Sequence, residues 1–324
     1  MNIGDIAEMA GVSRAAVSRY LNNGYISGEK RERIRKVIEE TGYQPSLMAQ
    51  TLRTRKTRLI GVILPRVNSD SISSILEGIS QSLSGTGYEM LLGATSNNPE
   101  RELDFLRIFS NKRVDGVILV ATVFTKEHIR LLKGMQIPVV IAGQRLGGFS
   151  CVYHDDFGAG CDIARYVTGR GRRRIGYIGV LEEDVAVGRM RREGVRKGLL
   201  EADTDFASLL TADFSVESGM SAMEAMLGER PDLDAVICAT DRIAIGAMHY
   251  LKSAGCRIPS QIAVTGFGDN QMGGVTTPAL TTVHFHYEEC GRTAAEKIVE
   301  QLEGSGRAVA EIRLGYELMP KESA

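Results

Sequence analysis

The segment GDIAEMAGVSRAAVSRYLNNGY, residues 4–25, carries charged and hydrogen-bonding side chains on one side of a short helical pattern. Apolar residues recur at helical spacing before and after Gly11, which predicts two short helices joined by a turn. Arginine and asparagine side chains on a short exposed helix can hydrogen-bond to base edges in the DNA major groove. A solvated helical hairpin is the alternative that this segment alone leaves open. The outward-facing side chains of the second helix are those of Arg14, Ala15, Ser18, Arg19 and Asn22.

Local capping signals position these side chains. We expect Asn2 and Ser13 to cap the first two helices, because their side chains can accept hydrogen bonds from unpaired backbone N–H groups. Gly11 is expected to adopt the left-handed conformation that ends the first helix. A third helix is predicted within residues 29–45, where a glycine and then a proline stop it. The sequence therefore predicts a three-helix DNA-binding domain over residues 1–45.

Residues 46–58, SLMAQTLRTRKTR, form a basic connector with a small apolar stripe. Isolated helices of fewer than about 12 residues are marginally stable in water. We therefore predict a hinge or linker that forms a helix only when other molecules cover it.

The charge distribution agrees with a DNA-binding segment at the start of the chain. Within a formal net charge of −1, residues 1–60 hold 11 Lys and Arg against 6 Asp and Glu, and the remainder holds 28 against 34. A basic segment on an acidic body is typical of a module that binds a polyanion, because contacts to phosphate supply most of the non-specific affinity for DNA.

The composition of 43% hydrophobic and 24% charged residues is ordinary for a globular protein of 324 residues. The sequence contains neither an apolar run of about 18 residues nor a basic-then-apolar leader, so we expect a cytoplasmic protein without membrane contact. The five cysteines include no C-x-x-C pair, which favours reduced thiols over disulfides or a zinc site. They are Cys151, Cys161, Cys238, Cys256 and Cys290.

From Leu59 onward, apolar runs alternate with helical patterns in two successive series. Continuous apolar strands that alternate with helices indicate buried parallel sheets, so residues 59–324 are predicted to form an α/β core of two doubly wound subdomains. The first subdomain is expected over about 59–155 plus a returning C-terminal segment, and the second over about 156–285. The predicted strands are 59–64, 88–94, 114–121, 138–143, 174–180, 207–213, 234–240 and 262–268, with helices near 71–85, 98–111, 125–134, 188–202, 215–228 and 241–254.

Ligands of open α/β sheets bind beyond the carboxyl ends of the strands. In this chain those ends carry hydroxyls, amides and isolated carboxylates, which suit a ligand with many hydroxyl groups. The residues are Asn68, Ser69, Ser71, Thr95, Ser96, Thr122, Gln144, Arg145, Asp156, Thr240, Asp241 and Asp269.

Several segments resemble the lactose-repressor (LacI/GalR) family of bacterial transcription factors in the family's order and spacing. They are DIAEMAGVSRAAVSRYLN, GYQPSLMAQTLRTRKTRLIGVILP, RRRIGYIG, GRMRREGVRKGL, ATDRIAIGAM and TTPALTTV, and they extend over almost the whole chain. The resemblance implies a helix-turn-helix headpiece that binds operator DNA as a dimer and a hinge helix that forms on DNA. It also implies a core like that of type I periplasmic sugar-binding proteins.

Under this resemblance, Arg14, Ala15 and Arg19 match recognition-helix positions that face base edges. Ala15 carries no hydrogen-bonding group, so its readout is limited to apolar contact such as a thymine methyl. Leu52 matches a hinge leucine that wedges into the minor groove and kinks the duplex. The further DNA-binding residues expected are Asn2, Ser13, Ser18, Asn22, Tyr25, Ser27, Ser46, Ala49 and Gln50.

In the core, Asp156 and Arg191 match effector-contacting positions, and the Arg191 guanidinium can bind hydroxyls or a carboxylate. A surface charge is the alternative reading of Arg191. Phe214 matches an aromatic that packs on a sugar ring in the family. The family often carries a carboxylate one residue before Asp269, where this chain has Gly268. The full expected effector set is Ser69, Ser71, Gln144, Asp156, Arg191, Phe214, Thr240, Asp241, Asp269 and Phe285.

Three other patterns give weaker signals. HFH at 284–286 places two imidazoles on one side of a strand, but a zinc site needs three or four protein ligands. TGRGRRRIG at 168–176 lacks the lysine and hydroxyl that end a nucleotide-binding loop, which favours a solvated loop. YHDD at 153–156 is a carboxylate pair without an activated nucleophile. We therefore expect no catalytic residue, cofactor or metal.

The resemblance implies a homodimeric repressor of a carbohydrate-utilisation operon that a sugar inducer releases from its operator. The absence of a heptad tail after YELMPKESA favours a dimer over a tetramer. The segments NNGYIS and GFGDN look most like those of sucrose-operon repressors, which favours sucrose or a related sugar. A regulator that needs its ligand as co-repressor, and a cytoplasmic sugar-binding protein or enzyme, remain alternatives.

Overall fold

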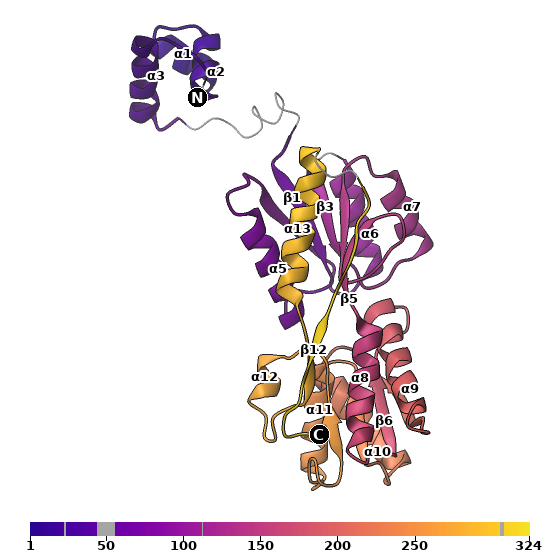
Figure 1. The fold of residues 1–324 in the computed structure, drawn as a ribbon. Helices are drawn as coiled ribbons and strands as arrows, with labels where there is room; N and C mark the ends of the chain where they lie inside the picture. The colour runs from indigo at the N-terminus through magenta and orange to yellow at the C-terminus, as the bar shows by residue number, and fades with distance from the viewer. Residues whose placement is uncertain (23, 44–55, 112, 305–307) are drawn as a thin grey trace. The chain divides into compact units, whose positions relative to one another are not determined.

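A computed structural model describes residues 1–324 except 23, 44–55, 112 and 305–307 (Figure 1). The chain divides into two compact units, Met1–Arg58 and Leu59–Ala324. Among the described residues, no helix is long and apolar enough to cross a membrane.

The N-terminal unit packs three helices around a small core, namely α1 (Ile3–Met9), α2 (Arg14–Leu21) and α3 (Gly28–Thr41). The Asn2 side chain caps α1 by accepting hydrogen bonds from two backbone N–H groups, and the Ser13 side chain caps α2 by accepting one. Gly11 has a φ of +61°. These three capping predictions are confirmed. The core consists of Ile6, Ala7, Ala10, Ala16, Val17, Ile34 and Val37.

Met9 differs from the sequence expectation. Its position in the apolar pattern of the first helix predicted burial, but its side chain is 56% exposed. With only three short helices, this unit covers a narrow stripe of α1, and Met9 lies beside that stripe.

The larger unit begins with a six-stranded parallel sheet in the order β11-β5-β4-β3-β1-β2. Helices α5 and α13 pack together on one face, while α6 and α7 cover the other. The strands are β1 (Leu59–Leu64), β2 (Glu89–Ala94), β3 (Gly116–Val120), β4 (Val139–Ala142), β5 (Ser150–His154) and β11 (Glu311–Leu314). The helices are α5 (Asp70–Leu83), α6 (Pro99–Ser110), α7 (Lys126–Gly134) and α13 (Tyr287–Glu303).

The second subdomain contains a four-stranded parallel sheet in the order β7-β6-β8-β9. Helices α8 and α9 pack as one pair, and α10 and α11 as another. The strands are β6 (Ile175–Gly179), β7 (Phe206–Thr211), β8 (Ala235–Cys238) and β9 (Ala263–Thr265). The helices are α8 (Asp156–Gly169), the π-helical turn η1 (Val185–Met190), α9 (Arg191–Leu200), α10 (Val216–Glu229), α11 (Asp241–Ser253) and α12 (Gln271–Gly274).

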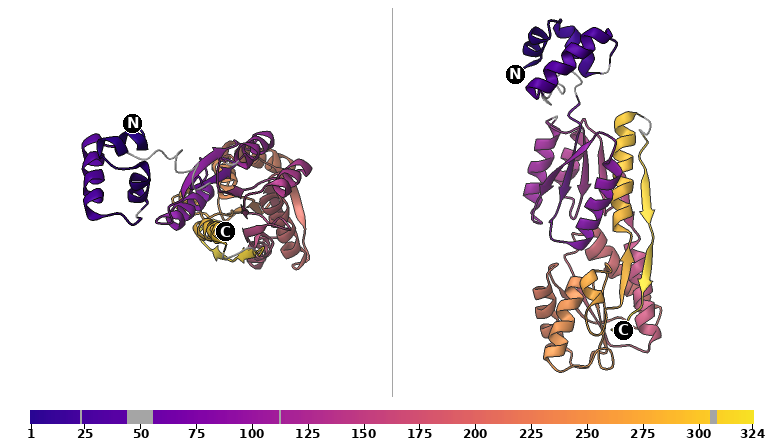
Figure 2. Two further views of the ribbon diagram at one scale, coloured as in Figure 1. Left: turned by 90° about the horizontal axis from the view of Figure 1, so that it is seen from above. Right: turned by 90° about the vertical axis from the view of Figure 1, so that its left-hand side faces the viewer.

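The chain crosses between the two subdomains three times, at residues 154–156, 285–287 and 314–316. At the last crossing β11 leads into β12 (Tyr316–Met319), which pairs antiparallel with β10 (Thr282–Phe285). The yellow C-terminal strands in Figure 2 therefore run past both subdomains. The chain end stays with the second subdomain, where Ser323 exchanges hydrogen bonds with the backbone of Val264.

The predicted fold class is confirmed: a helical headpiece precedes two parallel-sheet α/β subdomains. The strand and helix series was incomplete, because β5, α8, α13 and the strands from β10 onward lie outside it. The expected second subdomain of about 156–285 also leaves out β12 and the residues after it.

Candidate functional site

Helix α2 presents a polar surface on the N-terminal unit. Arg14, Ala15, Arg19 and Asn22 are exposed, and Ser18 is half-buried at the edge of the same face. The opposite face, with Ala16 and Val17, packs into the core and fixes the direction of this surface. The structure therefore brings the expected base-facing residues together on one side of a helix.

The residues around α2 differ in whether their side chains already make hydrogen bonds within the domain. The Asn2 and Ser13 side-chain oxygens accept the capping hydrogen bonds described above, which leaves hydrogen-bond donors on both groups. The Tyr25 side chain is 92% exposed, and Ser27 begins α3 without a capping hydrogen bond from its side chain. The expected hinge residues Ser46, Ala49, Gln50 and Leu52 lie outside the described residues.

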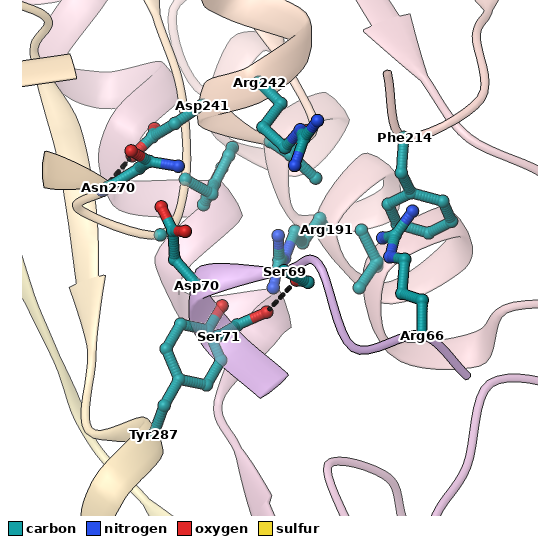
Figure 3. A pocket seen from close by; sticks show the side chains of 14 residues that line it. Arg66, Ser69, Asp70, Ser71, Arg191, Phe214, Asp241, Arg242, Asn270 and Tyr287 are labelled. Atoms are coloured by element: carbon teal, nitrogen blue, oxygen red, sulfur yellow. Dashed lines mark hydrogen bonds between the residues drawn. The ribbon is translucent and has the colours of Figure 1, made fainter. Parts of the chain in front are cut away.

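A second candidate site lies between the two subdomains of the core (Figure 3). Two adjoining cavities share several of their lining residues, among them Arg191 and Phe214. The loop after β1 and the start of α5 supply Ser69 and Ser71, whose hydroxyl oxygens lie 3.0 Å apart. Of the expected effector residues, those that line the two cavities are Ser69, Ser71, Gln144, Asp156, Arg191, Phe214, Thr240 and Asp241.

Arg191 is the most deeply enclosed cation of the cavity. Its Nε lies 2.6 Å from the Asp156 carboxylate, and both side chains are nearly buried. Its Nη1 donates a hydrogen bond of 2.7 Å to the backbone carbonyl of Ala239. The guanidinium carbon also lies 5.2 Å from the centre of the Phe267 ring and 4.7 Å from that of the Phe285 ring, in cation–π contact with both. Arg191 is therefore a buried, fully partnered group, and the surface-charge reading is wrong.

Asp241 begins α11 on the second subdomain. Its carboxylate accepts hydrogen bonds from the Thr282 hydroxyl, at 2.5 Å, and from the backbone N–H of Asn270, at 2.7 Å. Burial nevertheless raises its pKa to about 6, because removing a carboxylate from water disfavours the charged form. Thr240 caps the same helix through its side chain.

Two contacts join the subdomains across the cavity region. The Gln144 side-chain amide, after β4, donates to the Asp184 carboxylate, which precedes η1, at 3.4 Å. Arg242 of α11 donates a hydrogen bond of 2.9 Å to the backbone carbonyl of Asn68. In this structure the two subdomains are therefore in direct contact beside the cavity.

Asp269 and Phe285 depart from the expected effector set, because neither lines the two cavities. Asp269 has a left-handed φ of 49°, and its carboxylate bonds instead to Lys321 and His284, at 2.8 and 3.2 Å. Phe285 is buried against Arg191 and neighbouring rings. Both line an adjacent groove. Of the other residues expected at strand ends, Thr122 lines one of the two cavities, whereas Asn68, Thr95, Ser96 and Arg145 line neither.

The cavity-lining residues that sequence reasoning missed include Arg66, Asp70, Arg242, Asn270 and Tyr287. A signal existed for Arg66, since it follows β1 by two residues and the strand-end rule applies to it. Arg242 follows Asp241 directly. Tyr287 begins α13, where the predicted alternation of strands and helices had already ended.

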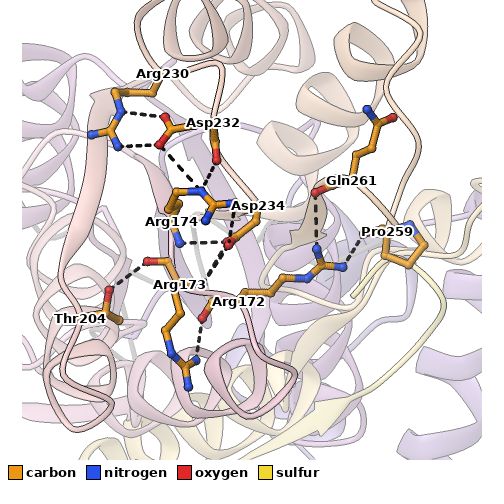
Figure 4. Close-up of polar contacts among 9 residues, drawn as sticks. All are labelled: Arg172, Arg173, Arg174, Thr204, Arg230, Asp232, Asp234, Pro259 and Gln261. Atoms are coloured by element: carbon orange, nitrogen blue, oxygen red, sulfur yellow. Dashed lines mark hydrogen bonds and ion pairs between the residues drawn. The ribbon is translucent and has the colours of Figure 1, made fainter.

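The weaker motifs have structural roles. In the 168–176 loop, the backbone N–H groups of Arg173 and Arg174 donate to the Asp234 carboxylate, and the Arg172 guanidinium donates to two backbone carbonyls (Figure 4). These hydrogen bonds tie the start of β6 to neighbouring loops.

The histidines in the other two motifs also have protein partners. His284 contacts Asp269, and His286 lies 3.9 Å from Glu317. Among the described residues, no group of three or more metal-ligating side chains occurs. In YHDD, Asp155 caps α8 and Asp156 pairs with Arg191.

Comparison with known proteins identifies both units. The family description "Bacterial regulatory proteins, lacI family" matches residues 2–46, and "Periplasmic binding protein-like domain" matches residues 164–324. A sucrose operon repressor of Staphylococcus xylosus is 34% identical over 302 residues, which cover 93% of this chain and 94% of the relative. The chain belongs to the LacI family of bacterial regulatory proteins.

Solved structures of LacI-family regulators share the whole fold. A complex of the transcriptional regulator CelR with cellobiose is 28% identical, covers all of both chains and has a TM-score of 0.78. A lac repressor dimer bound to operator and the anti-inducer ONPF has a TM-score of 0.91 over 100% of this chain and 98% of that one. Its identity of 22% supports the fold alone. LacI-family proteins are DNA-binding transcriptional regulators rather than enzymes, and this chain is one of them.

Proposed function

We propose that this protein represses a sucrose-utilisation operon and leaves its operator when a sucrose-class carbohydrate binds between the subdomains. The observation that carries the proposal is the similarity to a sucrose operon repressor over nearly the full length of both chains. The cavity supports it, because hydroxyl, amide and carboxylate groups line it together with the aromatic ring of Phe214.

In this proposal, Arg14, Ala15 and Arg19 read base edges, while the residues around them position the headpiece on phosphates. Two headpieces, one from each subunit of a homodimer, occupy the two halves of a palindromic operator. Leu52, in the connector, fills the minor groove at the operator centre.

The effector acts through the three crossings between the subdomains. A ligand that prefers one arrangement of the subdomains shifts the population toward it, and the DNA affinity changes by the same coupling free energy. A preference of about 100-fold corresponds to about 2.7 kcal/mol per site. By the same linkage, operator DNA weakens inducer binding by an equal factor.

The test is fluorescence anisotropy of the full chain on a palindromic fragment from its own promoter, at fixed salt, with and without sucrose. A scrambled fragment of equal length is the control for non-specific binding. Loss of operator binding with sucrose or a sucrose derivative supports the proposal. Tighter binding with the sugar contradicts release and indicates a co-repressor. Equal affinity for operator and scrambled DNA contradicts the repressor function.

A further inference from the structure

Two arginines that the effector expectations did not include stand at one end of the cavity (Figure 3). Arg66 follows β1 on the first subdomain, and Arg242 lies in the first turn of α11 on the second. Both line the cavity between the subdomains and also the adjoining groove that opens beside Phe214. Each subdomain therefore contributes one guanidinium to the same region.

These two guanidinium groups are partly buried but make few hydrogen bonds. Within the described residues, the Arg66 guanidinium takes part in no hydrogen bond or ion pair, and its centre lies 4.2 Å from the centre of the Phe214 ring. Arg242 makes one hydrogen bond, to the Asn68 carbonyl, and its Nε is buried without a partner. Buried donors without partners are costly, so positions of this kind are expected to be satisfied by something that binds.

The nearest carboxylates are already engaged elsewhere. Asp184 accepts hydrogen bonds from the Val187 N–H and the Gln144 amide. Asp213 accepts from Ser215 and Ser218 at the start of α10. Their negative charges raise the pKa of Arg66. Among the described residues, however, neither carboxylate lies within ion-pairing distance of Arg66 or Arg242, so both guanidinium groups lack a direct anionic partner.

The electrostatics of Arg66 agree with the lack of a direct anionic partner. Burial lowers the pKa of its guanidinium, and the positive charge of Arg242 lowers it further. Two like charges are held near each other where water is partly excluded. A bound anion would offset the repulsion between the two positive charges and would accept hydrogen bonds from the unpaired N–H groups.

We propose that the effector is a carbohydrate that carries an anionic group, a phosphate or a carboxylate, held between Arg66 and Arg242. The inference rests on the proposed function, since it concerns the ligand of the same cavity. The hydroxyl groups of the sugar face the other end, where Asp70, Asp241 and Asn270 lie (Figure 3).

The experiment compares matched ligands on the full chain by isothermal titration calorimetry, with operator release as a second measurement. The ligand pairs are sucrose with sucrose 6-phosphate, and glucose with glucose 6-phosphate and glucuronate. We expect an anionic member to bind at least about tenfold more tightly than its neutral partner, because hydrogen bonds to charged groups are the strong ones. The glucose series shows whether phosphate or carboxylate is preferred.

Variants assign the preference to the two arginines. R66Q and R242Q are each expected to lower the affinity for the anionic ligand about ten- to a hundredfold while changing that for the neutral sugar little. R66K, which keeps the charge, retains part of the preference. R130Q is the matched control, because Arg130 is an exposed arginine paired with Glu127 on α7, away from the cavity.

Equal affinity for neutral and anionic partners, or a preference that survives in the R66Q/R242Q double variant, overturns the inference. If neutral sucrose releases the operator at the same concentration as sucrose 6-phosphate does, the inference is overturned, but the proposed function still holds. Operator binding that no carbohydrate changes contradicts the proposed function itself, and the anionic effector falls with it.

Discussion

The Gln144 amide on the first subdomain donates a hydrogen bond to the Asp184 carboxylate on the second, at 3.4 Å, inside the region where the two subdomains meet. Asp184 also caps η1 by accepting from the Val187 N–H at 3.0 Å. Burial raises the pKa of Asp184 from its ordinary value of 3.8 to about 6, and the hydrogen bond from the Val187 N–H and the positive charge of Arg191 offset only part of that effect. A carboxylate whose charged form is penalised by burial therefore lies at the contact between the subdomains.

Replacing this carboxyl group by an amide is expected to stabilise the fold at neutral pH. The ionised Asp184 costs folding free energy above pH 6, and the cost disappears as the pH falls through the folded pKa of about 6 toward the unfolded value of 3.8. D184N should therefore raise the free energy of unfolding by up to about 3 kcal/mol near neutral pH and by almost nothing near pH 4. Urea unfolding over a series of pH values measures the difference.

D213N is the control, because the Asp213 carboxylate also accepts hydrogen bonds beside the start of a helix, α10, but has the opposite electrostatics. Hydrogen bonds from Ser215 and Ser218 lower its pKa, so its stabilising effect is present at neutral pH and is lost on acidification. D213N should lower stability at neutral pH. Parallel pH profiles for the two variants would contradict the assignment of Asp184 as a buried, destabilised carboxylate.

The Asp156–Arg191 ion pair is expected to hold the floor of the cavity. Removing one partner of a buried pair leaves an uncompensated charge, which typically costs about 3–5 kcal/mol. D156N should therefore strongly lower the free energy of unfolding and weaken effector binding. R196Q, which breaks the exposed pair between Arg196 and Asp205 on the neighbouring surface, should change stability by less than about 1 kcal/mol. Equal losses of stability in the two variants would show that burial of Arg191 has no special role.

Close packing of α5 against α13 depends on Gly78. A methyl group at this position would lie 1.9 Å from the backbone carbonyl oxygen of Glu288, so the two helices must move apart to accept one. G78A is expected to cost at least about 1–3 kcal/mol of stability. G228A, in a helix position where nothing lies within 4 Å, should be neutral or add up to about 1 kcal/mol. The urea midpoints of the two variants give the comparison. If G78A leaves the stability unchanged, the close contact of α5 with α13 at Gly78 is ruled out.

Local signals explain why much of the fold was predictable. The caps at Asn2 and Ser13 and the stop at Gly11 depend on residues within one turn, and the sequence displays them directly. The buried strands are continuous apolar runs. Helix α8 was missed because it contains glycines where an apolar periodicity would show. One of these, Gly160, lets α9 approach so closely that a methyl group would lie 2.4 Å from the Arg191 carbonyl oxygen.

The cavity residues were predictable only in part, because the sequence shows where strands end but not where the side chains of the following turns point. Strand ends meet at one edge of a sheet, which is why Ser69, Gln144 and Asp241 were found. The direction of a side chain within a turn is set by backbone angles that the sequence does not display. Asp269, with its positive φ, turns toward Lys321 instead of the cavity. The lack of partners at Arg66 is likewise a property of the packed structure.

Arg19, one of the two exposed arginines of α2, gives a direct test of base recognition. R19A should lower affinity for operator DNA by about 1–3 kcal/mol and affinity for scrambled DNA by much less, if the guanidinium contacts a base edge. R35Q is the control, since it removes one exposed positive charge from the same domain, where Arg35 already pairs with Glu32 and Glu39. Anisotropy on both DNAs at two salt concentrations separates the contributions. If R19A loses the same free energy on both DNAs, Arg19 contacts phosphate and base reading must come from other residues of this face.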